Sequence, residues 1–316
     1  MKRNLARNVQ LTGALLLIWA FLQDILLTLS TMTFVRDEHG KWQALIQAEQ
    51  ISPLWSVLSL LFVLTGLAVF LAGYLLKKRV VLPKHQGRTR LTLRDLAMSF
   101  GWVGLLFFGS VFLYYFAVGG LIPEWFRTSP GASALGGVSL QIVAILVIPL
   151  YFRKSLAEIG LQRPVLNWKM LGYVLMFFCF VYAMSLVTTS LSDWMGIDTE
   201  SYREKHISQE LNDAKALGIL MAMLPVLATA VIAPLGEELL FRGVLQSVLT
   251  AKWGVYAGVI GSALIFSLIH ADLVLFVPIF LMGVLFSVLY RITGSLWAPI
   301  WLHAINNLIA SLNDLF

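Results

Sequence analysis

Long apolar segments alternate with short polar ones along the whole chain. About 20 apolar residues are enough to cross the ~30 Å hydrocarbon core of a bilayer as a helix. Nine segments approach or exceed that length, the shorter ones with the help of flanking residues: 11–29, 54–76, 96–118, 135–152, 171–191, 217–249, 255–269, 273–290 and 296–312. The pattern therefore predicts an all-α fold, a polytopic transmembrane helical bundle of about nine spans.

The sixth of these segments is too long for one perpendicular span. Its 33 residues would make about 50 Å of helix at 1.5 Å per residue. The helix is therefore predicted to bend, break or protrude, and Pro225 and Pro234 are the expected places because proline disrupts helix hydrogen bonding.

Composition agrees with a membrane protein. Of 316 residues, 59% are hydrophobic and 13% are charged, whereas charged residues make up about a quarter of soluble domains. The net charge of +6 does not indicate nucleic-acid binding, because the basic residues lie between apolar segments, as topology signals do. Cys179 is the single cysteine, which excludes an intrachain disulfide.

The basic residues also predict the orientation. Seven lysines and arginines follow the second apolar segment, and Arg153 and Lys154 follow the fourth, so both connections are predicted to be cytoplasmic. The N-terminus is then cytoplasmic and the C-terminus lies outside. The acid-containing loops 36–50 and 192–216 are predicted to lie outside as well.

The sixth segment carries three charged residues, Glu237, Glu238 and Arg242. Each would cost roughly 2.5 to 3.5 kcal/mol at the membrane centre, so such residues are functional candidates. Glu238 and Arg242 are four residues apart and are predicted to form an ion pair on one helical face. Glu237 is turned about 100° away from Glu238 and requires a separate partner.

Two further segments supply histidines. His270 ends the seventh segment, and His303 shares a helical face with Asn307 in the ninth. Counted from the cytoplasmic ends, the rise to Glu237, His270 and His303 is about 22, 27 and 18 Å, so the three can converge. A lone intramembrane histidine often only bonds a backbone carbonyl, but three helices here contribute protic groups. Residues 165–316 are therefore predicted to form the functional core, behind a variable set of N-terminal helices at 1–160.

Three chemistries remain open for this set. Glu237 and His270 can deprotonate a water while His303 and Asn307 donate to an oxyanion, which would be hydrolysis without a metal. Alternatively, two histidines and Glu237 can hold a catalytic zinc, although the usual His-Glu-x-x-His helix is absent. A proton-coupled transporter is the third, but no inverted repeat supports it.

Three motifs occur in order along these helices: Glu-Glu-x-x-x-Arg at 237–242, Phe-x-x-x-His at 266–270 and His-x-x-x-Asn at 303–307. The region 217–316 thereby resembles the CAAX-protease and bacteriocin-processing (CPBP, Abi) family of intramembrane endopeptidases. The resemblance implies cleavage of a membrane-associated protein or peptide. Eukaryotic members trim a prenylated C-terminus, and bacterial members are linked to peptide maturation, bacteriocin self-immunity or surface-protein control.

The resemblance also implies roles for particular residues. Glu237 would be the general base together with His270. His303 and Asn307 would form the oxyanion site. The residues implied to be structural are Glu238, Arg242 and Phe266.

These roles set the expected cofactor and partners. No cofactor is expected, with zinc as the alternative, held by Glu237, His270 and His303. The expected partners are membrane lipid and a membrane-associated substrate, without nucleic acid. The expected location is the plasma membrane of a bacterium. A membrane scaffold that cleaves nothing is a further alternative for the function.

Overall fold

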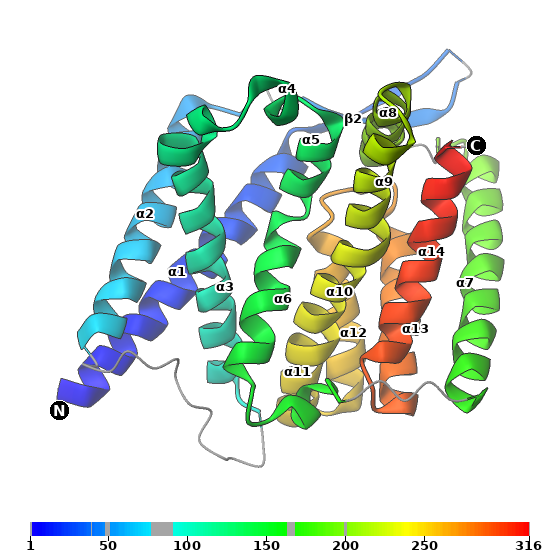
Figure 1. The fold of residues 1–316 in the computed structure, drawn as a ribbon. Helices are drawn as coiled ribbons and strands as arrows, with labels where there is room; N and C mark the ends of the chain where they lie inside the picture. The colour runs from blue at the N-terminus through cyan, green and yellow to red at the C-terminus, as the bar shows by residue number, and fades with distance from the viewer. Residues whose placement is uncertain are drawn as a thin grey trace.

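Helices standing side by side dominate the computed structural model, which describes residues 2–38, 40–47, 51–76, 91–162, 168–198 and 201–315. Figure 1 shows them as one bundle, with the N-terminus and the C-terminus at opposite ends. The N-terminal half contains α1 (Lys2–Ser30), α2 (Pro53–Leu76), α3 (Leu93–Leu113), η2 (Tyr114–Val118), η3 (Gly119–Leu121), α4 (Glu124–Arg127), α5 (Pro130–Gly137), α6 (Ser139–Tyr151) and η4 (Leu156–Ile159). Six of the seven basic residues expected after the second span, at 77–90, lie outside the described residues.

The C-terminal half carries the predicted core. It begins with α7 (Trp168–Trp194) and α8 (Tyr202–Ala216). One continuous helix follows, made of α9 (Ile219–Leu227), η5 (Ala228–Ile232), α10 (Ala233–Glu238), η6 (Leu239–Gln246) and α11 (Ser247–Trp253). The chain ends with α12 (Val255–Leu268), α13 (Phe276–Thr293) and α14 (Trp297–Leu315).

The predicted all-α polytopic bundle is confirmed. In the described part of the chain, six helices are long and apolar enough to cross a membrane. The pair α5 and α6, bent by 44°, makes a seventh if it is counted as one span. The count of nine is approximate, because α12 has only 14 residues and α14 is interrupted by polar side chains.

The sixth apolar segment does not break at its prolines. Residues 219–253 stay in one helix of 35 residues, whose path is adjusted by two π-helical segments, η5 and η6. Pro225 lies inside α9, and Pro234 is the second residue of α10, close after η5. A π-helical turn beside a proline accommodates the missing N–H without ending the helix, so the helix continues past both prolines.

The described parts of the two connections predicted to lie outside are folded rather than irregular. Residues 32–36 and 42–46 form an antiparallel hairpin of β1 (Met32–Arg36) and β2 (Trp42–Ile46), with Arg36 opposite Trp42. The hairpin bonds the connection between α7 and α8, where the Trp42 N–H donates to Gly196 O at 2.7 Å. The ammonium of Lys41 lies 2.7 Å from a carboxylate oxygen of Asp193, and this bond raises the pKa of Lys41. Both the hairpin and α8 lie at the end of the bundle that carries the C-terminus (Figure 1).

The N-terminal helices pack through glycines. A Cβ on Gly13 would lie 2.2 Å from the backbone N of Phe70, and one on Gly73 would lie 2.3 Å from that of Gln10. Small residues of this kind let membrane helices approach to backbone contact. Between the same helices, Gln23 Nε2 donates to Ser59 Oγ at 2.9 Å.

Candidate functional site

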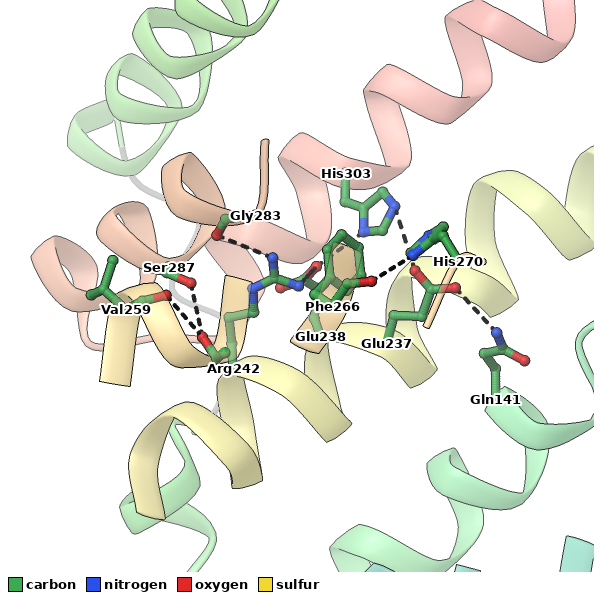
Figure 2. A network of polar contacts seen from close by, with 11 residues as sticks. Gln141, Glu237, Glu238, Arg242, Val259, Phe266, His270, Gly283, Ser287 and His303 are labelled. Atoms are coloured by element: carbon green, nitrogen blue, oxygen red, sulfur yellow. Dashed lines mark hydrogen bonds and ion pairs between the residues drawn. The ribbon is translucent and has the colours of Figure 1, made fainter. Parts of the chain in front are cut away.

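Three parts of the chain bring the predicted residues together inside the bundle. Glu237 and Glu238 lie at the end of α10, His270 lies in the turn after α12, and His303 lies in α14. Figure 2 shows both histidine rings beside the Glu237 carboxylate. The predicted convergence of these residues is therefore seen in the structure, and their roles stay predictions.

Glu238 and Arg242 form the predicted ion pair. Arg242 Nη1 donates to Glu238 Oε1 at 2.9 Å, and both side chains are completely buried. Arg242 Nη2 also donates to Gly283 O at 3.2 Å, which ties η6 to α13. The guanidinium carbon lies 4.3 Å from the ring centroid of Phe266 and 5.2 Å from that of Phe286, a cation–π arrangement. Phe266 thus contacts the structural pair.

His303 lies between the two glutamates. Its Nδ1 is 3.0 Å from Glu238 Oε1, and its Nε2 is 3.9 Å from Glu237 Oε2. The first distance is a hydrogen bond, and Nδ1 is the donor because an ionised carboxylate only accepts. The second is longer than a hydrogen bond and is wide enough for a water to bridge. The imidazole stacks on Phe286 with ring centroids 4.9 Å apart, which fixes its plane.

The Glu237 carboxylate is bound differently from that of Glu238. Its Oε1 accepts a hydrogen bond from Gln141 Nε2 in α6, at 3.1 Å. Within the described ranges, no lysine or arginine forms a salt bridge with it. Gln141 is not among the predicted site residues. Its one signal in the sequence is that it is the only amide side chain in the apolar segment 135–152.

His270 is held by its own helix. Its Nδ1 lies 2.6 Å from the carbonyl oxygen of Phe266, four residues earlier. Since a carbonyl only accepts, Nδ1 carries the proton and Nε2 keeps its lone pair. This is the ordinary backbone bond of an intramembrane histidine, and it also fixes the ring beside Glu237. The next residue, Ala271, has φ of 50°, the only positive value for a non-glycine residue among those described.

Two other acidic residues, Asp272 near the site and Asp24 in α1, are not part of the group around Glu237. Asp272 closes the turn before α13, since its Oδ1 accepts from the N–H groups of Val274 and Leu275 at 3.0 and 3.1 Å. Asp24 is exposed on α1, far along the chain from the motifs.

Asn307 lies against the π-helical segment η5. Its Nδ2 donates to Thr229 O at 2.9 Å, and its Oδ1 is 3.4 Å from Asn306 Nδ2. An amide nitrogen has two hydrogens, so one N–H of Asn307 remains available for another acceptor. In the described structure, Asn307 makes no hydrogen bond to either glutamate.

A polar stripe continues from Glu238 at every fourth residue through Arg242 and Gln246. Gln246 is completely buried, and its Nε2 donates to Ser287 O at 3.0 Å. Ser287 Oγ lies 3.2 Å from Ser262 Oγ, so the stripe joins η6 to α12 and α13. The stripe thereby holds together the helices around the site, a packing function that the spacing of the motifs does not indicate.

The zinc alternative does not match the side-chain positions. Over the described residues, no three His, Cys, Asp or Glu side chains are grouped closely enough to hold a metal ion. Nδ1 of His270 is bonded to the backbone and Nδ1 of His303 to Glu238, so only the two Nε2 atoms could be ligands, and they do not form such a group with Glu237. The donor set as arranged does not fit zinc, and we derive no step through a metal.

An apolar groove lies beside the site, between α14 and the segment α9–η5. Its volume is about 420 Å³, and apolar residues line it throughout. Its inner end reaches Ala230 and Ala304, the neighbours in sequence of Thr229 and His303. Other lining residues are Ala222, Met223, Val226, Trp301, Ile305 and Leu308.

The C-terminal half of the chain is similar to known sequences. Residues 219–309 match the family model described as "Type II CAAX prenyl endopeptidase Rce1-like", and this range contains all three motifs. A Bacillus subtilis (strain 168) protein with the provisional name membrane peptidase YdiL is 24% identical over 172 residues, 53% of this chain and 67% of the relative. An uncharacterized 24.3 kDa protein of Escherichia coli is 33% identical over 86 residues, 26% of this chain and 40% of the relative. No solved structure matches the chain.

Proposed function

Because the chain belongs to the Rce1-like family of CAAX prenyl endopeptidases, we propose that it is an intramembrane endopeptidase that cleaves a membrane-associated protein or peptide. Membership in this family implies protease activity in general terms, and the multiple apolar helices make the chain a multi-pass membrane protein. The substrate, the mechanism and the role of each residue are part of the proposal.

The observation that carries the proposal is the difference between the two adjacent glutamates. Glu238 is completely buried and is bound by Arg242 and His303, so its negative charge is compensated. Glu237 is bound by a neutral amide, and its Oε2 faces an imidazole at 3.9 Å. A carboxylate that no lysine or arginine of the described structure pairs with, and that lies next to two histidines, is suited to accept a proton from water.

We assign the base to Glu237, assisted by His270. A water between Glu237 Oε2 and the imidazole Nε2 atoms would give its proton to Oε2 as its oxygen bonds the peptide carbonyl carbon. The carbonyl electron pair moves to the carbonyl oxygen, which becomes an oxyanion. When the oxyanion collapses, the C–N bond breaks, and the proton on Glu237 passes to the leaving amine. The products are a carboxylic acid and an amine, and no cofactor takes part.

The oxyanion would be stabilised by His303 and Asn307. Nδ1 of His303 already donates to Glu238, so Nε2 can donate to an oxyanion only in the imidazolium form. The second N–H of Asn307 is the other donor, while its first holds the side chain against Thr229 O. Two fixed donors of this kind stabilise charge that develops during attack.

The apolar groove supplies a place for the substrate. It runs along α14 from Trp301 to Leu315, past the segment that carries His303 and Asn307, and its lining is apolar throughout. We propose that the apolar chain next to the scissile bond lies in it, surrounded by membrane lipid. The basic residues near the N-terminus favour a cytoplasmic N-terminus, and we propose a bacterial plasma membrane as the location.

Peptide cleavage by purified protein in proteoliposomes tests the proposal. The probes are a farnesylated peptide ending in a Cys-a-a-X sequence and the same peptide without the lipid, with released fragments detected by mass spectrometry. We expect the wild type to cleave at least one probe and Glu237→Gln to lose at least about 100-fold in rate. Asp24→Asn is the matched control, since it removes another acid from a membrane-spanning helix. Cleavage of neither probe, or a folded Glu237→Gln that cleaves at the wild-type rate, would contradict the proposal.

A further inference from the structure

Gln141 contacts the Glu237 carboxylate from α6, outside the region 219–309 that matches the family model. We propose that Gln141 is a positioning residue, which holds Oε1 of Glu237 and thereby leaves Oε2 as the oxygen that takes the proton. The inference rests on the proposed function, in which Glu237 is the base. It adds a residue from the N-terminal helices to the site.

The bend between α5 and α6 places Gln141 at the depth of the site. The two helices meet at 44°, and Gln141 is the third residue of α6, in its first turn. A straight span would carry the chain past this level without a change of direction. Because of the bend, the first turn of α6 lies against α10. Figure 2 shows the amide nitrogen of Gln141 directed toward Glu237.

Gly236 makes the close approach possible. A Cβ at this position would lie 2.4 Å from Cβ, 2.6 Å from Cα and 2.8 Å from the carbonyl oxygen of Gln141. Distances below about 3 Å to backbone atoms cannot be relieved by turning a side chain, so α6 would have to move. The residue immediately before the base is thus the one that allows the Gln141 backbone to lie against α10.

The Gln141 amide serves Glu237 and no other described group. Its Nε2 donates to Glu237, while its Oε1 is buried without a hydrogen-bond partner among the described residues. The hydrogen bond between Gln23 and Ser59 also joins two helices and also leaves the glutamine Oε1 buried without a partner, but it connects two neutral groups. Gln141 differs in that its amide donates to a carboxylate, and a hydrogen bond to a charged group is the stronger kind.

The charges around Glu237 explain why a neutral donor fits there. His303 faces it from α14, His270 from the turn after α12, and Glu238 and Arg242 belong to its own helix. From α6 it meets Gln141. A cation at this position would neutralise the base, whereas an apolar residue would leave Oε1 without a partner. An amide orients the carboxylate without removing its charge.

Gln141→Leu, Gly236→Ala and the control Gln23→Leu test the inference. Gln141→Leu keeps the approximate size but removes the donor. Gly236→Ala keeps the donor but displaces the backbone that carries it. Gln23→Leu removes another buried interhelical glutamine, far from the site. The infrared band of the Glu237 carboxyl group is identified as the one absent from Glu237→Gln, and it is titrated with pH in each variant.

We expect the Glu237 band to titrate about one pH unit higher in Gln141→Leu, because the charged form has lost a donor, and to stay unchanged in Gln23→Leu. On a cleaved probe, kcat should fall about 10- to 100-fold with little change in KM. Gly236→Ala should change both quantities in the same direction. An unchanged titration midpoint in Gln141→Leu would overturn the inference even if Gly236→Ala fails to fold. A shifted band in a protein that cleaves nothing would support the contact and contradict only the proposed function.

Discussion

The Nδ1 atom of His303 lies 3.0 Å from Oε1 of Glu238, the same oxygen that accepts from Arg242 Nη1 at 2.9 Å. One carboxylate oxygen therefore joins α14 to η6, and Arg242 extends the link to α13 through Gly283 O. Glu238 has a structural reason to be charged at this depth, which separates it from its neighbour Glu237.

The stability lost on removing both partners of the Glu238–Arg242 pair should be smaller than the sum of the losses on removing each partner alone. Arg242→Met or Glu238→Gln leaves an uncompensated buried charge, which typically costs about 3 to 5 kcal/mol. The double variant should lose less than the sum. It should not recover wild-type stability, because His303 also loses its acceptor. Thermal unfolding in detergent of the three variants measures this, and strict additivity would count against the pair.

Asn307→Ala should lower turnover rather than weaken substrate binding. Charge on the carbonyl oxygen develops only during attack, and loss of one oxyanion donor typically costs about 100- to 1000-fold in turnover. Asn306→Ala is the control, because it leaves the bond from Asn307 to Thr229 O in place. The measurement is kcat and KM on a cleaved probe. A higher KM with unchanged kcat would speak against the oxyanion role.

His303→Ala separates the metal-free mechanism from the zinc alternative. Without a metal, His303→Ala and Asn307→Ala should resemble each other in lowering turnover, and active wild type should contain no stoichiometric zinc. With a metal, His303→Ala should lose bound zinc, while Asn307→Ala should keep it, since an amide is not an ordinary zinc ligand. Elemental analysis alongside turnover decides. One zinc per active wild-type molecule, absent from His303→Ala, would refute the mechanism proposed above.

Filling the apolar groove should raise KM. Leu308 lines the groove on α14, and Leu308→Trp would occupy space that the substrate chain needs. Loss of one or two methylene contacts typically changes specificity by roughly 10-fold or more. Leu175→Trp on α7 is the control, an exposed position outside the groove. Equal effects of the two substitutions on KM would show that the substrate does not use the groove.

Contacts within one helix could be predicted from the sequence, and contacts between distant helices could not. The Glu238–Arg242 pair follows from spacing alone, because residues four apart share a helical face. The bond from Gln141 to Glu237 joins positions 96 residues apart, so no periodicity indicates it. The contact between Asn307 and Thr229 spans 78 positions and also depends on a π-helical turn, which the apolar pattern does not reveal.

The predicted loops illustrate the same limit. The charges of a connection indicate on which side of the membrane it lies, but they do not indicate its local fold. The hairpin of residues 32–46 contains β-branched and aromatic residues that favour strands, and the polar helix α8 begins with Ser201 as its cap. The strand-favouring residues and the serine cap are both visible in the sequence, but they lie between the apolar segments and so do not contribute to the pattern that predicts the spans.

The two π-helical segments on either side of α10 determine how the site responds to a change in helix length. A π turn holds one more residue than an α turn, because its hydrogen bonds run from residue i to i+5. Loss of a single residue from η5, such as Val231, would let the backbone return to α geometry, and everything beyond it would keep its direction relative to α9. An added residue has no such relief, because η5 already holds the extra one, and it would turn Glu237 by about 100° away from Gln141 or His303. One residue inserted beside α10 should therefore disable the protein as thoroughly as replacing the glutamate itself, whereas one residue removed from η5 should not.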